Sequence, residues 1–202
     1  LSDSNALRIY DGLLLHPLGF NTQAYTKVFE NPMIFKGFMN TFYVLFFGTL
    51  TNTVLTVVTG YVLSRKDFTK YMNIFVIVTM YFSGGLIPTF LTIKALGLLN
   101  NRWVLIIPSA LSTYNLIIMR AAFLSVPKSL EEAAFMDGAN HLTVLFKVLV
   151  PLTKATIAVI ILYSAVGHWN AWFNAMIYIQ DANKFPLQLV LRGILIQNDT
   201  SK

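Results

Sequence analysis

Residues 125–151 read SVPKSLEEAAFMDGANHLTVLFKVLVP and contain the side chains whose spacing most clearly indicates a built element. Ser129 and Glu132 have the spacing of a capping box, in which the serine caps a helix and the glutamate reaches back to its backbone. Gly138 is expected to end this helix in the left-handed conformation, and Asn140 can cap a second helix. Two short helices joined by a glycine turn could form a docking element for a cytosolic protein, or an amphipathic interfacial loop without a partner.

A second group of side chains could line a pathway for a polar solute. The candidates are Asn170, Trp172, Phe173 and Asn174, with Tyr114 and its neighbour Asn115 earlier in the chain. In a continuous helix Asn170 and Asn174 lie one turn apart on one face. Polar groups in an apolar segment are costly unless they face a bundle interior or water. Trp and Tyr near the end of such a segment are also typical of a membrane-interface belt, so both interpretations stay open.

The composition indicates a membrane protein. The chain has 202 residues, of which 55% are hydrophobic and 12% charged, whereas a soluble domain has roughly 25% charged residues. The mean hydropathy is +0.61. This excludes a disordered chain, and the lack of cysteine excludes a disulfide scaffold. The net charge is +6, but the basic residues form no stripe, so we expect no nucleic-acid partner.

The charge distribution supports the same class. No Asp, Glu, Lys or Arg occurs in 37–64, 71–93, 103–119 or 155–180. A spanning helix needs about 20 apolar residues, and three of these segments are long enough. A soluble helix would show a polar face, which these segments lack. The sequence therefore predicts an all-α, polytopic transmembrane helix bundle. Its four expected spans are about 38–63, 71–93, 103–124 and 155–179.

The loops between these spans suggest an orientation. Seven basic residues lie in or beside the loops that follow the first and third spans, against four in the loops that follow the second and fourth. The positive-inside rule then makes the loop 125–151 cytoplasmic. Residues 1–36 and 180–202 would be extracytoplasmic segments flanking a membrane domain at 37–179, although Arg8, Lys27 and Lys36 reduce the charge difference.

Proline and glycine interrupt the predicted spans. The interruptions are Ser83-Gly84-Gly85 with Pro88, Pro108-Ser109, and Gly167. Membrane helices tolerate such residues where neighbouring groups satisfy the freed backbone. They predict either kinked packing helices or the hinge, gate or cavity lining of a transporter.

At the loop, the chain resembles the EAA-loop family of bacterial ABC importer permeases. The residues that match are Glu132-Ala133-Ala134, Gly138 after three residues, and Val148-Leu149-Val150-Pro151 after nine more. Valines replace the Ile and Leu of the family pattern at 148 and 150. Further stretches resemble the carbohydrate-uptake branch. They are Gly60–Arg65, Leu86–Pro88 with Leu96–Asn100, and Trp169–Phe173.

The resemblance implies a coupling role for the loop. In such permeases it forms a helix that docks into a cleft on a separate ATP-hydrolysing subunit. The implied coupling residues are Glu131, Glu132, Ala133, Ala134, Gly138 and Pro151. The small alanines would allow close approach, and Gly138 would set the turn. We expect helix capping to be the main structural job of Glu132.

The resemblance also implies the rest of the assembly. The partners would be a second, different permease subunit, two ATP-binding subunits and an extracytoplasmic solute-binding protein. The cargo would be a sugar or oligosaccharide, and the location the bacterial inner membrane. Such permeases have one helix before and one after the region present here, and the chain opens with Leu1. We therefore expect a fragment that lacks the first and last membrane helices.

The chain shows no sign of being an enzyme. It contains no G-x-x-x-x-G-K-[ST] phosphate loop, so ATP would be handled by another subunit, with no cofactor here. His16, His141 and His168 are far apart, which argues against a metal site. The alternative is an ion-coupled secondary transporter or channel, which usually carries charged residues inside its spans.

Overall fold

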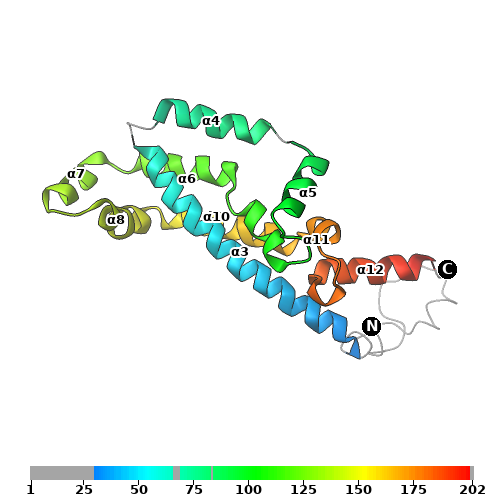
Figure 1. Cartoon of the computed structure of the whole chain (residues 1–202). Coiled ribbons are helices and arrows are strands. Elements are labelled where there is room, and N and C mark those ends of the chain that lie inside the picture. Colours follow the sequence, from blue (N-terminus) through cyan, green and yellow to red (C-terminus); the bar gives the residue numbers. More distant parts are fainter. Residues whose placement is uncertain (1–29, 66–68, 83, 201–202) are drawn as a thin grey trace, which may run out of the picture.

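A computed structural model of the chain describes residues 30–65, 69–82 and 84–200, the side chains of 69–70 and 197–200 excepted. Every regular element in these ranges is a helix, so the all-α fold is confirmed (Figure 1). Of the predicted segment 1–36, residues 1–29 lie outside the described ranges. The helices are α3 (Pro32–Ser64), α4 (Thr69–Tyr81), α5 (Leu86–Ala95), η2 (Arg102–Leu105), η3 (Ile107–Ser109), α6 (Thr113–Ser125), α7 (Lys128–Met136), α8 (His141–Thr143), η4 (Val144–Leu149), α9 (Val150–Leu152), α10 (Lys154–Trp169), α11 (Trp172–Tyr178), η5 (Ala182–Lys184) and α12 (Leu187–Thr200).

The longest helix, α3, forms the axis of the molecule (Figure 1). The side-chain oxygen of Asn31 caps it by accepting a hydrogen bond from the backbone nitrogen of Met33 at 3.0 Å. Pro32 takes the first helical position, where no N–H donor is needed. The helix covers the predicted span of about 38–63, but residues 32–36 also belong to it rather than to the preceding segment.

The predicted span 71–93 is not one helix. It is divided into α4 and α5, which end and begin on either side of Gly85. The φ angle of Gly85 is +83°, a value that side chains with a Cβ rarely adopt and that ends helical geometry.

The other two predicted spans are also divided. The segment 103–124 begins as the short turns η2 and η3, then bends by 48° into α6. The segment 155–179 is α10 followed by α11, with Asn170 and Ala171 between them. In the described part of the chain α3 alone is long and apolar enough to cross a membrane unbroken, and there are up to four spans if each of three bent helix pairs is one.

Two apolar cores hold the helices together. One lies beside α7 and α8 and joins α3, α6, η4 and α10 through nine buried side chains, among them Tyr61, Phe123 and Leu149. The other lies near the opposite end of α3 and joins α5, η2 and α11 through side chains such as Val44, Leu105 and Tyr178. Buried polar side chains occur between these cores along α3, where Asn52 and Thr56 are 3% and 0% exposed.

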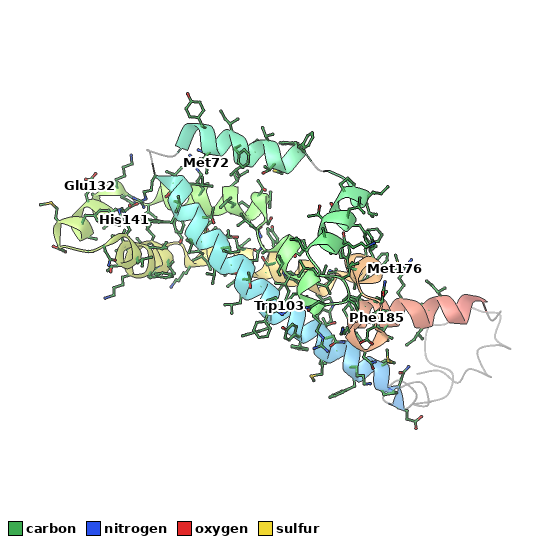
Figure 2. The ribbon with its side chains drawn as sticks, viewed as in Figure 1. Met72, Trp103, Glu132, His141, Met176 and Phe185 are labelled. Carbon is green, nitrogen blue, oxygen red and sulfur yellow. The ribbon has the colours of Figure 1, made fainter. Side chains whose placement is uncertain are left out.

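The outside of the molecule is unusually apolar (Figure 2). Along α3 the large apolar side chains that are exposed are Phe35, Phe38, Met39, Phe42, Phe46, Phe47, Leu50, Val54, Leu55, Val58 and Val62. In water this face would be strongly unfavourable, whereas lipid tails solvate it without cost. Apolar groups outside and amides inside are the pattern of a membrane helix bundle.

Candidate functional site

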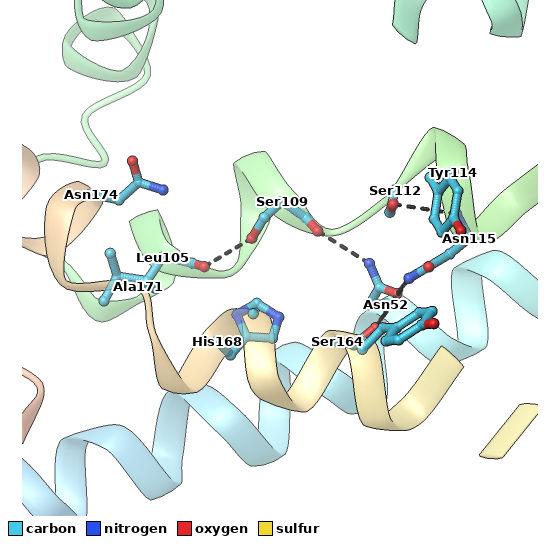
Figure 3. Close-up of a pocket in the computed structure, with 12 residues that line it drawn as sticks. Asn52, Leu105, Ser109, Ser112, Tyr114, Asn115, Ser164, His168, Ala171 and Asn174 are labelled. Atoms are coloured by element: carbon cyan, nitrogen blue, oxygen red, sulfur yellow. Dashed lines mark hydrogen bonds between the residues drawn. The ribbon is translucent and has the colours of Figure 1, made fainter. Parts of the chain in front are cut away.

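A cavity of about 510 Å³ opens between the two cores (Figure 3). The residues that line it come from α3, the η2–α6 segment and the α10–α11 segment. They are Asn52, Leu105, Ser109, Ser112, Tyr114, Asn115, Tyr163, Ser164, Gly167, His168, Ala171 and Asn174. Amides, hydroxyls and an imidazole predominate, and this lining contains no Asp, Glu, Lys or Arg within the described ranges.

At one wall of the cavity Asn52 joins three segments (Figure 3). Its Oδ1 accepts hydrogen bonds from Ser164 Oγ of α10 at 2.7 Å and from Asn115 Nδ2 of α6 at 3.5 Å. Its Nδ2 donates to the carbonyl of Ser109 at 3.3 Å. Asn52 and Ser164 were not among the predicted pathway residues, although isolated polar side chains in apolar spans are a usable signal for an interior site.

The ring of His168 lies against α3 at Gly48. A Cβ atom built on Gly48 would lie 2.5 Å from His168 Nε2, which is closer than any real contact. Glycine is therefore required at 48 for the imidazole to occupy this wall of the cavity. His168 itself is 8% exposed.

Two tyrosines form another part of the lining. Tyr114 of α6 and Tyr163 of α10 have ring centroids 6.5 Å apart. Their side chains are 54% and 51% exposed, and Ser112 and Asn174 line the same cavity. Rings beside hydroxyls and amides can bind a solute that has both apolar faces and hydrogen-bonding groups.

The predicted pathway residues are only partly brought together. Tyr114 and Asn174 line the cavity, whereas Asn170, Trp172 and Phe173 do not. The prediction that Asn170 and Asn174 share one helix face is wrong, because α10 ends at Trp169 and α11 begins at Trp172. The ring of Trp172 instead lies 4.1 Å from the guanidinium carbon of Arg192.

The loop 125–151 differs from its prediction at its start. The helix α7 begins at Lys128, its N-cap is Pro127, and no side chain caps it, so the capping box of Ser129 and Glu132 is not formed. Pro127 explains the difference, because its fixed φ of −58° with a ψ of 128° already orients the chain as an N-cap two residues before Ser129. Glu132 and Ala133 are exposed, while Ala134 is half-buried.

The end of α7 agrees with the prediction. Gly138 has a φ of +82°, and the backbone nitrogens of Gly138 and Ala139 donate to the carbonyls of Phe135 and Ala134, each at 3.0 Å. This is the Schellman arrangement that ends helices at glycine. Asn140 then caps α8, because its side-chain oxygen accepts a hydrogen bond from the backbone nitrogen of Thr143 at 2.8 Å.

Ion pairing distinguishes the two neighbouring glutamates. Glu131 is 9% exposed and pairs with Arg65, the residue after α3, whereas Glu132 points outward. Pro151 is exposed within α9, close to an 84° bend between the helices His141–Leu152 and Lys154–Trp169. Across the described residues, no three His, Cys, Asp or Glu side chains lie close enough to hold a metal ion.

Comparisons with known proteins identify a family and several relatives that the chain resembles. The family model for "Binding-protein-dependent transport system inner membrane component" matches residues 34–173. The polygalacturonan/rhamnogalacturonan transport system permease protein YtcP of Bacillus subtilis is 41% identical over 185 residues, covering 91% of this chain and 65% of that protein. The inner membrane ABC transporter permease protein YcjP of Escherichia coli is 30% identical over 203 residues, covering 96% of this chain and 71% of that protein.

A solved structure agrees with the fold. It is a bacterial ABC transporter involved in the import of the acidic polysaccharide alginate, matched with a TM-score of 0.91 at 36% identity over 95% of this chain and 69% of that chain. The chain spans less than two thirds of YtcP and of the B. subtilis protein LplC, at 65% and 63% of their lengths.

Proposed function

Because the chain belongs to the family of binding-protein-dependent transport system inner membrane components, we propose that it is a permease subunit of an ATP-driven importer for a sugar or oligosaccharide. The observation that carries this proposal is the uncharged, hydrogen-bonding cavity between α3, α6 and α10. The protein would be a multi-pass component of the bacterial cytoplasmic membrane.

The chemistry of the cavity suits a sugar. Its volume of about 510 Å³ is within the range of small-molecule sites. Tyr114 and Tyr163 offer ring faces, while Ser112, Asn174 and His168 offer hydrogen-bonding groups. Hydroxyl-rich solutes need many modest polar contacts rather than one strong charge. Relatives named for polygalacturonan and for arabinooligosaccharides support a carbohydrate, and which one is a matter for experiment.

The loop 125–151 supplies the proposed link to ATP. On α7 the exposed residues Glu132, Ala133 and Met136 present one acidic, one small and one apolar side chain to a partner. Gly138 holds the following turn in place. We place this loop in the cytoplasm, where two ATP-binding subunits would dock on it and on the loop of a second permease subunit. An extracytoplasmic binding protein would deliver the solute.

The alternative is an ion-coupled transporter. Such a protein needs titratable or charged groups in its pathway. The cavity contains His168 but no carboxylate among the described side chains, and the ion pairs in the described ranges lie at helix ends. These observations favour ATP as the energy source.

Reconstitution tests the proposal. The full-length permease, its partner permease, the ATP-binding subunits and the binding protein are placed in proteoliposomes and offered labelled neutral and acidic oligosaccharides. We expect uptake to require the binding protein, and to require ATP on the side of the membrane that carries the ATP-binding subunits. This uptake should persist when ionophores collapse ion gradients. Uptake without ATP that stops with the ionophores would support the alternative instead.

A further inference from the structure

Two side-chain contacts tie the end of α3 to the loop, and a third joins the two α3 residues that make them. A guanidinium nitrogen of Arg65 pairs with the carboxylate of Glu131 in α7. The same guanidinium lies over the ring of Tyr61, with 4.1 Å between its central carbon and the ring centroid. The hydroxyl of Tyr61 is in turn hydrogen-bonded to Nδ1 of His141 in α8, at 2.9 Å. Both short helices of the loop are therefore held by one turn of α3.

Glu131 offers little surface for docking. Its side chain is 11% exposed, and that of Arg65 is 28% exposed. Because the Glu131 carboxylate is largely withdrawn from solvent, removing Arg65 would leave a poorly compensated charge, so the pair favours one geometry. The neighbouring Glu132 is exposed and free to meet another protein. The two adjacent glutamates therefore have different surroundings, and only Glu132 is placed to contact another protein.

A further bond locks α6 into the same cluster. Arg120 of α6 donates from Nε to the carbonyl of Leu63, in the last turn of α3, at 3.0 Å. The side chains of Tyr61 and Phe123 pack edge to face beside it, with ring centroids 6.4 Å apart. The ends of α3 and α6 and the beginning of the loop thus form one packed unit.

From this cluster α3 leads directly to the cavity. The helix is unbroken between Asn52, at the cavity wall, and Ser64, so about 20 Å of continuous helix separates Asn52 from Arg65. Since no break separates the two sites, we expect a displacement of the loop that keeps the Arg65 pair intact to move the cavity wall as well. Nearer the start of α3, Asn40 donates to the carbonyls of Asn183 and Phe185, at 2.7 and 3.0 Å, which ties that part of the helix to the segment before α12.

We propose that Arg65 and Glu131 are positioning residues that fasten the loop to α3, so that a movement imposed on the loop is transmitted to the cavity. The inference rests on the proposed function, because it needs an ATP-binding partner to move the loop. Docking is assigned to the exposed face of α7, and transmission to its buried face.

The first experiment separates docking from transmission. The complete transporter is assembled in proteoliposomes with Glu131→Gln, and with Glu30→Gln as a matched control, since Glu30 is an exposed glutamate just before α3, at the end of that helix away from the loop. We expect Glu131→Gln to retain the ATP-binding subunits on co-purification but to transport about tenfold less solute per ATP hydrolysed, within the range of typical coupling free energies. The control should retain both properties.

A charge exchange tests the pair itself. Arg65→Glu alone and Glu131→Arg alone should each lose transport per ATP, and the double variant should recover part of it. A requirement for either side chain on its own, independent of the pair, would not produce this recovery, and retention of the ATP-binding subunits on co-purification shows that each variant still assembles. A variant in which transport per ATP is unchanged, or a double variant no better than the single ones, would overturn the proposal.

A covalent link covers the case in which the single variants fail to assemble. These 202 residues contain no cysteine, so Arg65→Cys with Glu131→Cys gives one addressable pair once any cysteine elsewhere in the complex is replaced. The unlinked double-cysteine variant should transport poorly, and joining its two cysteines with a short bis-maleimide should restore transport. If transport stays low after linking, α3 and α7 do not remain fastened to each other during the transport cycle, and the proposal is wrong.

The two proposals fail in different ways. If Glu131→Gln releases the ATP-binding subunits, Glu131 serves docking and the transmission role is wrong, while the importer assignment stands. If the wild-type permease itself retains no ATP-binding subunit, the proposed function fails.

Discussion

Replacing Gly48 with alanine is a direct test of how the cavity wall is built. The new Cβ would lie 2.5 Å from Nε2, 2.6 Å from Cε1 and 2.8 Å from Cδ2 of His168. Carbon atoms in good contact are about 3.5–4.0 Å apart, so the ring must move by about 1 Å. The side chain at 48 cannot turn away, because Gly48 is in the interior of the unbroken helix α3.

Comparison with Gly167→Ala gives the size of the stability loss expected from the clash at Gly48. Both glycines are in helices, so both substitutions gain about 1 kcal/mol of helix propensity. A Cβ at Gly167 meets nothing within 4 Å, so only Gly48→Ala adds overpacking, which costs about 1–3 kcal/mol. For a protein of this size each kcal/mol shifts Tm by about 2–4 °C. Gly48→Ala should therefore melt about 2–12 °C below Gly167→Ala.

The assay is thermal unfolding of the full-length permease in detergent, with wild type and both variants measured side by side. A double-mutant cycle then identifies the clash, because Gly48→Ala should cost less when His168 is alanine. Equal melting temperatures for the two alanine variants would refute the packing described here. A cost at 48 that is independent of residue 168 would do the same.

Three further predictions concern the cavity and the loop. Asn52→Leu removes three side-chain hydrogen bonds, and at about 0.6 kcal/mol for each such bond in a membrane bundle we expect a loss of about 2 kcal/mol in thermal unfolding. An unchanged Tm would argue against the bonds. Gly138→Val should abolish co-purification of an ATP-binding subunit while membrane insertion persists, because a β-branched residue does not tolerate a φ of +82°. Gly138→Asn should retain the subunit, because asparagine tolerates this φ. Tyr114→Ala and Asn174→Ala should raise the KM for uptake without releasing that subunit, and an unchanged KM in both would remove the cavity from the pathway.

The long helix and the loop turns could be predicted because their causes are local. The segment that becomes α3 has no charged residue after Lys36 and no proline after Pro32, so nothing interrupts it. Gly138 and Asn140 are residues whose own backbone preferences fix a helix end and a helix start. The predicted N-cap of α7 was wrong by two residues, since Pro127 takes that position in place of Ser129.

The division of the last predicted span left little local signal beyond Gly167, which lies two residues before α10 ends. Between α10 and α11 the sequence reads Trp169-Asn170-Ala171-Trp172, with neither glycine nor proline. The backbone nitrogen of Trp172 donates to the carbonyl of Asn170 at 2.8 Å, in a tight turn that frees Trp172 to stack on Arg192. That partner is distant in sequence, so periodicity could not indicate the break.

Long-range contacts also decided the roles of the polar residues. The spacing of Glu131 and Glu132 cannot show which of them faces inward, because the answer depends on Arg65, far earlier in the chain. Asn52 and Ser164 are 112 residues apart, and only the packing of α3 against α10 brings them together. Their occurrence as polar side chains in apolar helices was nonetheless a usable indication of an interior site.

Co-purification is the most direct test of the central claim, that this chain is the permease of an ATP-driven importer. The full-length permease is extracted under gentle conditions, in detergent or nanodiscs, beside Glu132→Lys, which reverses the charge of an exposed residue on α7. We expect wild type to retain an ATP-binding subunit and the variant to lose it. A wild-type permease that retains no such subunit would contradict its assignment to an ATP-driven importer.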